Sequence, residues 1–372
     1  MNKVLVVIIA SDLSAGGGGR ETWLKNFLDS SNIKLQYDEL HIICYGMKKA
    51  DCLSFDKKVI VHWNKKCGKL PLFRFLFHVK NTLNLIYNKS NDFKVIACGS
   101  WFELLALSFS SIKNKSNVVT ICWLRSIVIK ELSRYYSTLL LPICKMIEHN
   151  LLKKMDFIIS NGFDTKAHYL DQGIDSIVIP NSIQVNKFEI NNVESPIILY
   201  CGRLSVEKGI REFVSTISTL LASRYDFEVI IIGSGRDELL KPIIDHDKVH
   251  YLGQLSGDNL LSQISKASIS AHLTLSGELG GGGISHSLLE SMCLGQMIVC
   301  WDSKIFTQVH GSDQFFMAKE GELTNLVMKM NDAIDLVLSS EYQNSRILMN
   351  HSGNIYNFDE HVNLYLKIIE HV

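Results

Sequence analysis

Short apolar runs alternate with helix-length amphipathic segments along almost the whole chain. This alternation is typical of α/β layers built on parallel sheets, because each parallel crossover needs a helix. Helices are expected between the runs, for example over 21–28, 209–223 and 285–294. The apolar runs predict strands at 4–10, 39–44, 59–62, 94–97, 118–122, 157–160, 176–179, 197–200, 227–232, 249–252, 267–273 and 297–300.

The strand pattern falls into two series, separated by a polar stretch. Residues 186–195 are predominantly polar and are interpreted as a linker. We therefore expect an N-terminal Rossmann-like lobe over 1–190 and a second Rossmann-like lobe over 191–356. No other internal repeat is evident.

Composition narrows the class of protein. The 372 residues are 47% hydrophobic and 20% charged, with five prolines, which indicates a folded α/β protein rather than a disordered one. The longest apolar runs fall short of the ~18 residues that a membrane-spanning helix needs. The N-terminus lacks the pattern of a signal peptide. The nine cysteines are scattered and never spaced C-x-x-C, which favours a reducing cytoplasm over a disulfide framework or a zinc site.

The net charge of zero conceals an asymmetry between the halves. Residues 1–190 contain 25 Lys and Arg against 16 Asp and Glu, whereas 191–372 contain 13 against 22. The basic excess concentrates in 61–91, where six basic residues and several aromatics occur without an acid. This pattern predicts either a basic, aromatic helix on an anionic membrane or an ordinary helix with a solvated basic face. No nucleic-acid-binding motif is present.

Four glycine-bearing turns follow predicted strands, at 16–19, 202, 233–235 and 280–283. Glycine lets backbone N–H groups approach an anion, and a following helix N-terminus adds a favourable dipole. Neither a complete G-x-G-x-x-G fingerprint nor a P-loop is present, which disfavours nicotinamide and ATP chemistry.

Several segments match one known pattern in order along the chain. They are I-P-N-S-I at 179–183, Y-C-G-R-L-S-V-E-K-G at 200–209, V-H-Y-L-G-Q-L at 249–255 and G-G-I-S-H-S-L-L-E-S-M-C-L-G at 282–295. Together they resemble the retaining GT-B glycosyltransferases of family four. The resemblance implies two Rossmann-like lobes that face each other across a cleft, with residues 357–372 packed back on the first lobe.

The resemblance also implies the site residues. Arg203 and Lys208 match the cations that stabilise the leaving diphosphate, where developing negative charge makes a nearby cation effective. Glu290 matches the glutamate that accepts hydrogen bonds from the donor ribose. The implied donor-binding set is Gly16, Gly17, Gly253, Gln254, Gly282, Gly283, Ile284, Ser285, Leu289 and Glu290.

The sequence departs from the family pattern in three places. Gly282 occupies the position of the family's first glutamate, and Glu278 is the nearest acid. The two histidines of the family's first lobe are replaced, near 97–100 and 122–123, and Arg125 is a polar candidate there. His286 is interpreted either as a site residue or as a helix-surface residue.

The resemblance implies a cytoplasmic, metal-independent, retaining glycosyltransferase without a cofactor, peripheral on the inner face of the membrane. Its donor would be a nucleoside-diphosphate sugar, and its acceptor a glycan hydroxyl, lipid-linked, in bacterial lipopolysaccharide, O-antigen or capsule assembly. Two alternatives remain open: a nucleotide-sugar epimerase of the same fold, and a non-catalytic sugar-nucleotide-binding partner.

Overall fold

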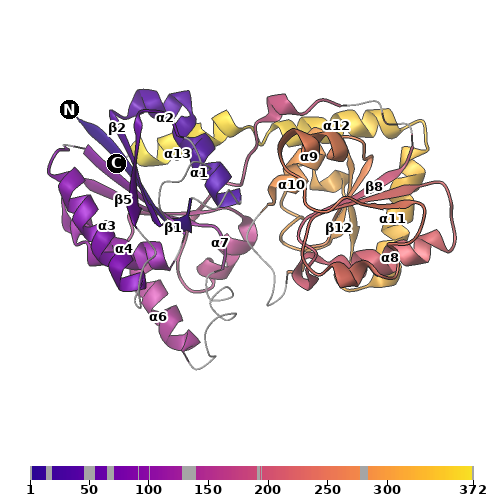
Figure 1. The fold of residues 1–372 in the computed structure, drawn as a ribbon, viewed down its shortest axis with the longest axis horizontal. Coiled ribbons are helices and arrows are strands. Elements are labelled where there is room, and N and C mark those ends of the chain that lie inside the picture. The colour runs from indigo at the N-terminus through magenta and orange to yellow at the C-terminus, as the bar shows by residue number, and fades with distance from the viewer. Residues whose placement is uncertain are drawn as a thin grey trace. The chain divides into compact units, whose positions relative to one another are not determined.

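The chain forms two compact units in the computed structural model (Figure 1). Unit 1 comprises Met1–Pro180 with Asp359–Val372, and unit 2 comprises Asn181–Phe358. The sequence pattern predicts that the first lobe ends at residue 190 and the second at residue 356. The structure describes residues 2–13, 19–45, 55–64, 71–90, 92–99, 101–127, 140–190, 193, 195–276 and 284–370.

Unit 1 is built on a seven-stranded sheet with the order β3-β2-β1-β4-β5-β6-β7 among the described residues. All neighbouring strands are parallel. Its strands are β1 (Lys3–Asp12), β2 (Glu39–Tyr45), β3 (Val59–Asn64), β4 (Asp92–Cys98), β5 (Val118–Leu124), β6 (Phe157–Ser160) and β7 (Ile177–Val178).

Helices cover this sheet because its central strands are apolar on both faces. Val4 to Ile9 of β1 are all buried, which a parallel sheet needs when layers pack on each side. The helices of unit 1 are α1 (Gly19–Asp29), α2 (Ser31–Gln36), α3 (Pro71–Tyr87), α4 (Phe102–Phe109), α6 (Leu141–Leu152), α7 (Phe163–Leu170) and α13 (Phe358–Glu370).

The C-terminal helix α13 belongs to the core of unit 1. The indole Nε1 of Trp23 on α1 donates to His361 Nε2 at 2.6 Å, and His361 Nδ1 donates to the carbonyl of Pro180 at 2.9 Å. Tyr365 is fully buried beside Trp23 and Phe27, with ring centroids 5.5 and 5.3 Å away. A last helix is thereby attached to the first lobe through buried aromatic packing.

Unit 2 repeats the architecture with a six-stranded parallel sheet of order β10-β9-β8-β11-β12-β13 in its described part. Its strands are β8 (Ile197–Cys201), β9 (Glu228–Ile232), β10 (Val249–Tyr251), β11 (Ile269–His272), β12 (Met297–Trp301) and β13 (Phe316–Ala318). Its helices are α8 (Ile210–Leu221), α9 (Gly257–Ile264), α10 (His286–Cys293), α11 (Leu323–Val337) and α12 (Tyr342–Asn354).

The predicted α/β class with two Rossmann-like parallel-sheet units is confirmed. Two details of the prediction were wrong. Strand β13 was not among the predicted strands. The predicted linker over 186–195 begins inside unit 2, since Val185 and Phe188 pack against the core of that unit.

The predicted basic helix over 61–91 also needs correction. Residues 61–64 lie in β3, and α3 begins at Pro71. Phe75 is one of the aromatics of this segment that the membrane-facing interpretation includes, but it is fully buried in the core with Val79 and Leu83. Helical spacing explains this, because residues four apart share one face and that face of α3 packs on the sheet.

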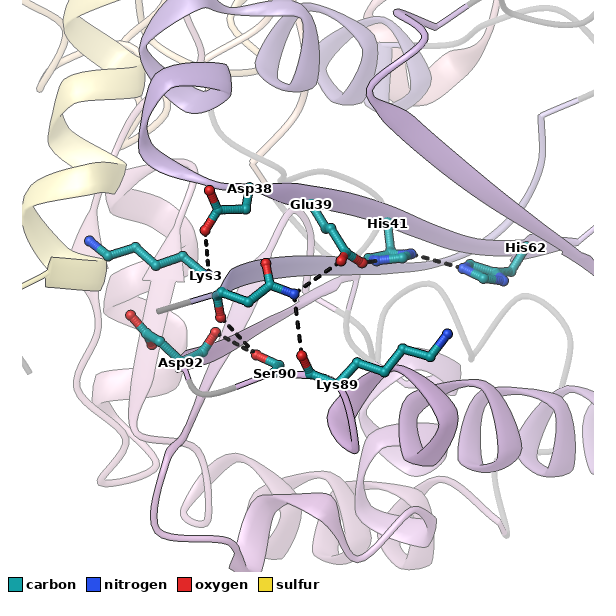
Figure 2. A network of polar contacts seen from close by, with 9 residues as sticks. Lys3, Asp38, Glu39, His41, His62, Lys89, Ser90 and Asp92 are labelled. Atoms are coloured by element: carbon teal, nitrogen blue, oxygen red, sulfur yellow. Dashed lines mark hydrogen bonds and ion pairs between the residues drawn. The ribbon is translucent and has the colours of Figure 1, made fainter.

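Two histidines link the edge strand β3 to its neighbour β2 in the first sheet (Figure 2). His41 Nε2 lies 3.1 Å from Glu39 Oε2, and the carboxylate can only accept, so this nitrogen donates. His41 Nδ1 therefore accepts from His62 Nε2, at 3.0 Å. Burial lowers the pKa of His41 and lowers the pKa of His62 to about 4. The fold thus needs both rings neutral.

The stability of unit 1 should therefore depend on pH through His62. Its pKa is about 4 in the folded chain against an ordinary 6.5, so the unfolded chain binds more protons between these values. Stability present above pH 6.5 should be lost as the pH falls towards 4. Thermal unfolding across this range should show a smaller loss for His62→Gln, which keeps an N–H donor, and an unchanged loss for the exposed His351→Gln. Equal pH dependence in all three proteins would contradict this role.

Candidate functional site

The candidate site lies at the carboxyl edge of the sheet in unit 2. In this sheet β8 lies between β9 and β11. The chain continues from β8 to β9 on one side, and β11 pairs with β8 on the other side. Loops after β8 and β11 therefore diverge, and open α/β sheets bind ligands at such a switch point. Every neighbouring strand is parallel, so the loops after β8, β9, β10 and β11 all emerge at this edge.

The loop after β8 is fixed by backbone contacts with the loop after β9. The amide of Leu204 donates to the carbonyl of Ser234 at 3.0 Å, and Arg236 N donates back to Leu204 at 2.8 Å. A Cβ on Gly233 would lie 1.8 Å from the carbonyl oxygen of Gly202. The two loops are therefore so close together that only glycine fits at this position. The position of Arg203 is therefore set by its flanking backbone.

Gly209 places the other end of this loop against β11. Its φ is +71°, and a Cβ there would lie 2.2 Å from the carbonyl oxygen of Leu273. Both facts require glycine, since the left-handed conformation and the contact each exclude a side chain. The amide of Leu275 also donates to Glu207 O at 3.1 Å. The glycine of the E-K-G segment thus brings Lys208 beside the end of β11.

Tyr200 ties both cationic positions to the sheet. Its buried hydroxyl lies 2.9 Å from the carbonyl oxygen of Arg203 and 3.2 Å from that of Lys208. The hydroxyl is thus held between the backbones of the two cationic residues. These contacts give the loop a defined shape before any ligand binds.

The two cations of the loop have no counter-ion in the described part of the chain. Neither Arg203 nor Lys208 forms an ion pair with any residue that the structure describes. Lys208 is half-buried, and its Nζ donates to Thr274 Oγ1 at 3.3 Å. Burial lowers the pKa of Lys208, and repulsion from Arg203 lowers it further. An exposed arginine beside a half-buried lysine, both without an ion-pair partner among the described residues, forms a site for an anion.

Glu290 supplies an acceptor near the same strand ends. It lies on α10, whose first turn is capped by Ser285 Oγ accepting from Leu288 N at 3.2 Å. Glu290 has no hydrogen bond or ion pair within the part of the chain that the structure describes. Burial raises its pKa to about 7, and its charge contributes to the raised pKa of Cys201, at the end of β8. A half-buried, unpartnered carboxylate of this kind fits hydroxyl donors.

A buried polar chain behind the site was missed by the sequence analysis. Ser291 Oγ on α10 donates to Ser270 Oγ at 2.9 Å, so Ser270 in turn donates to His272 Nε2 at 3.0 Å. Burial lowers the pKa of His272 to about 3, with a further contribution from the charge of Lys208. The neutral ring and two serines fasten α10 to β11. Polar residues alternating with apolar ones inside a predicted strand were the available signal.

The other predicted donor-site residues divide into backbone and core positions. Gly253 accepts from Gly233 N at 2.8 Å, and the exposed Gln254 accepts from Ser234 Oγ at 2.9 Å. Both therefore lie at the site edge. Ile284 is buried, and its carbonyl accepts from Asn181 Nδ2 at 2.6 Å. The side chain of Leu289 is fully buried in the core of unit 2, so it supports α10 by packing.

The remaining predictions fall outside this cluster. Gly16, Gly17, Glu278, Gly282 and Gly283 lie outside the described residues. His286 is the first residue of α10 and is half-buried. Arg125 follows β5 in unit 1.

Comparison with known proteins gives the cluster a context. Residues 195–335, which carry Arg203, Lys208 and Glu290, match the sequence family described as Glycosyl transferases group 1. An uncharacterized glycosyltransferase of Methanocaldococcus jannaschii is 22% identical over 327 residues, covering 80% of this chain and 81% of that protein.

Solved structures agree over the whole chain. Sucrose-phosphate synthase from Thermosynechococcus elongatus superposes with a TM-score of 0.76 at 13% identity, covering 100% of both chains. Anabaena HepE, solved in complex with UDP, gives a TM-score of 0.74 at 14% identity and 100% coverage of both chains. The lipopolysaccharide outer core galactosyltransferase WaaB gives 0.71 at 16% identity, covering 98% of this chain and 99% of that one. The chain has the GT-B fold, and the family match supports a glycosyltransferase.

Proposed function

We propose that this chain is a retaining glycosyltransferase that moves a sugar from a nucleoside-diphosphate sugar to a hydroxyl of a glycan acceptor. The observation that carries the proposal is the pair of cations Arg203 and Lys208, which have no ion-pair partner among the described residues and whose loop is held by backbone contacts at the switch point of unit 2. A diphosphate supplies the charge that they lack. HepE, with a similar fold, was solved with UDP, which supports a nucleotide donor.

The proposed chemistry follows from these charges. When the bond between sugar and diphosphate breaks, negative charge grows on the leaving oxygen, and the cations at this position stabilise it. Arg203 offers a planar fork of donors, whereas Lys208 offers a compact charge. The backbone at both residues is held by contacts within unit 2, and the Lys208 amine is anchored on Thr274, so the loop needs little reorganisation when the ligand binds. In this proposal the two cations take the place of a metal ion.

Glu290 orients the nucleotide in this proposal. Its carboxylate accepts from the ribose hydroxyls, which gives this half-buried group the donors that it lacks among the described residues. The buried chain of Ser291, Ser270 and His272 keeps α10 in place while Glu290 binds. Binding and leaving-group stabilisation are thereby divided between α10 and the loop after β8.

The two alternatives make different predictions in one assay. A nucleotide-sugar epimerase would convert the free donor without an acceptor, and a binding partner would bind the donor without turnover. The proposed transferase consumes the donor only when a glycan acceptor is present. A screen of nucleoside-diphosphate sugars by thermal shift, followed by product analysis with and without acceptor, separates the three, because selective binding stabilises the fold.

Removal of either cation should slow transfer. Arg203→Ala and Lys208→Ala should each lower kcat by about 100- to 1,000-fold, the usual loss when one charge-stabilising donor is removed. Arg211→Ala is the matched control, because Arg211 is exposed on the neighbouring helix α8. Steady-state kinetics of folded, purified variants provide the measurement. Near-normal kcat in both variants would remove these residues from the site.

Neutralising Glu290 should weaken donor binding instead. Glu290→Gln should raise the donor KM by about tenfold with little change in kcat, because the ribose is bound alike in ground and transition states. Donor affinity of the parent protein should also fall as the pH drops below about 7, where Glu290 becomes protonated, and this dependence should disappear in the variant. The exposed Glu360→Gln serves as control. A fall in kcat alone would contradict the assignment.

We further propose that unit 1 contacts an anionic membrane that presents a lipid-linked acceptor, as in bacterial surface polysaccharide assembly. No described helix is both long and apolar enough to cross a bilayer. Phe73 and Phe77 on α3 are exposed residues, with 55% and 52% of their surface accessible to solvent. Phe77 meets Phe109 of α4 edge to face at 5.2 Å, and Lys80 Nζ lies 5.1 Å from the Phe109 ring. Exposed aromatics beside basic groups suit a headgroup region.

Vesicle sedimentation tests this surface. Phe77→Ser should reduce binding to anionic vesicles, whereas Leu35→Ser, at an exposed apolar position on α2, should not. The attraction should weaken at high salt, since the Debye length falls from about 10 Å at 0.1 M to about 3 Å at 1 M. Equal binding to neutral and anionic vesicles, or to neither, would refute the membrane contact.

A further inference from the structure

The carboxyl edge of the sheet in unit 1 holds a cluster of charged groups at its own switch point, between β1 and β4. Glu103 Oε1 accepts from the backbone amide of Ala10 at 2.7 Å and from Arg20 Nη1 at 3.4 Å. Glu21 accepts from the hydroxyl of Ser11 and lies 3.7 Å from Arg20 Nε. Both carboxylates therefore have donors of their own.

Arg125 stands apart within this cluster. It follows β5, and its guanidinium Cζ lies 4.5 Å from the centre of the Trp123 ring. Its Nη1 is buried without a hydrogen-bond partner in the part of the chain that the structure describes. Arg20 repels this guanidinium and Glu21 attracts it, but neither carboxylate of the cluster bonds to it. Leaving a charged donor buried and unpaired is costly, so a ligand that satisfies it gains that energy.

Two more buried donors lie beside this guanidinium. The Trp123 indole Nε1 and the Tyr365 hydroxyl are both buried and have no hydrogen-bond partner among the described residues. Their rings meet edge to face at 6.1 Å, and the electrostatic influence of Arg125 reaches the Tyr365 hydroxyl. Indole and guanidinium nitrogens can only donate. Three buried donors in one cluster require a ligand that is rich in acceptors.

We propose that Arg125, with Trp123 and Tyr365, forms an anion site in unit 1 that binds a phosphate or carboxylate group of the acceptor. That the anion belongs to the acceptor rests on the proposed transferase function. The existence of the anion site itself does not rest on the transferase function, because the site is inferred from donors of unit 1 alone. Arg125 as a residue is only half-buried, which leaves its guanidinium a side for the anion to approach.

Inorganic phosphate is the first probe. With saturating UDP present to occupy the donor site, phosphate should change the tryptophan fluorescence saturably, since Trp123 is in contact with Arg125. Arg125→Gln should weaken this binding by at least about tenfold, the loss typical of one charged hydrogen bond. Tyr365→Phe keeps the buried ring and removes only the hydroxyl, so it should weaken binding several-fold without unfolding α13. Arg211→Gln, on unit 2, should bind phosphate normally.

Unchanged phosphate affinity in both Arg125→Gln and Tyr365→Phe would overturn the site. Loss of the fluorescence signal in Arg203→Gln would also overturn it, because that result would place the ion on unit 2. Competition with phosphate then tests the class of acceptor. Glucose 6-phosphate and glucuronate should displace phosphate, whereas glucose should not. Displacement by glucose alone would refute anion recognition. Failure of donor turnover with phosphate binding intact would instead count against the proposed function.

Discussion

The close contact between Gly209 and the end of β11 is the constraint on which the candidate site depends. A glycine in the left-handed conformation packs its Cα against the carbonyl of Leu273. This contact holds the loop after β8 at the point where the neighbouring crossovers diverge. Lys208 is the residue immediately before, so its amine is kept half-buried between β8 and β11.

Two buried polar chains contrast with the charged groups of the proposed sites. The His41–His62 pair and the Ser291–Ser270–His272 chain consist of neutral groups bonded to one another. Three charged side chains that lack a bonded partner among the described residues lie instead at the carboxyl edge of a parallel sheet. Arg203 and Glu290 do so in unit 2, and Arg125 does so in unit 1. The contrast separates support from recognition.

The same topology underlies both edges. Each sheet has a switch point beside the first strand of its unit, β1 or β8. In unit 1 that edge is closed in part by α13, whose Tyr365 packs on Trp23 and Phe27. The chain thus returns to its first lobe through aromatic packing, and the same helix contributes a donor to the proposed anion site.

The sequence by itself determined the alternation of strands and helices, the two parallel-sheet units and the cationic segment around Arg203. Apolar runs and glycine turns are local signals, so they can be recognised in the sequence without knowledge of the fold. The orientation of Phe75 into the core, the partner of Lys208 and the role of His272 were decided only by tertiary structure. Each depends on which residues from distant strands meet: Thr274 contacts Lys208 because β11 lies beside β8. Hydrogen-bond partners and burial depend on how these distant strands pack together, so no local sequence pattern encodes them.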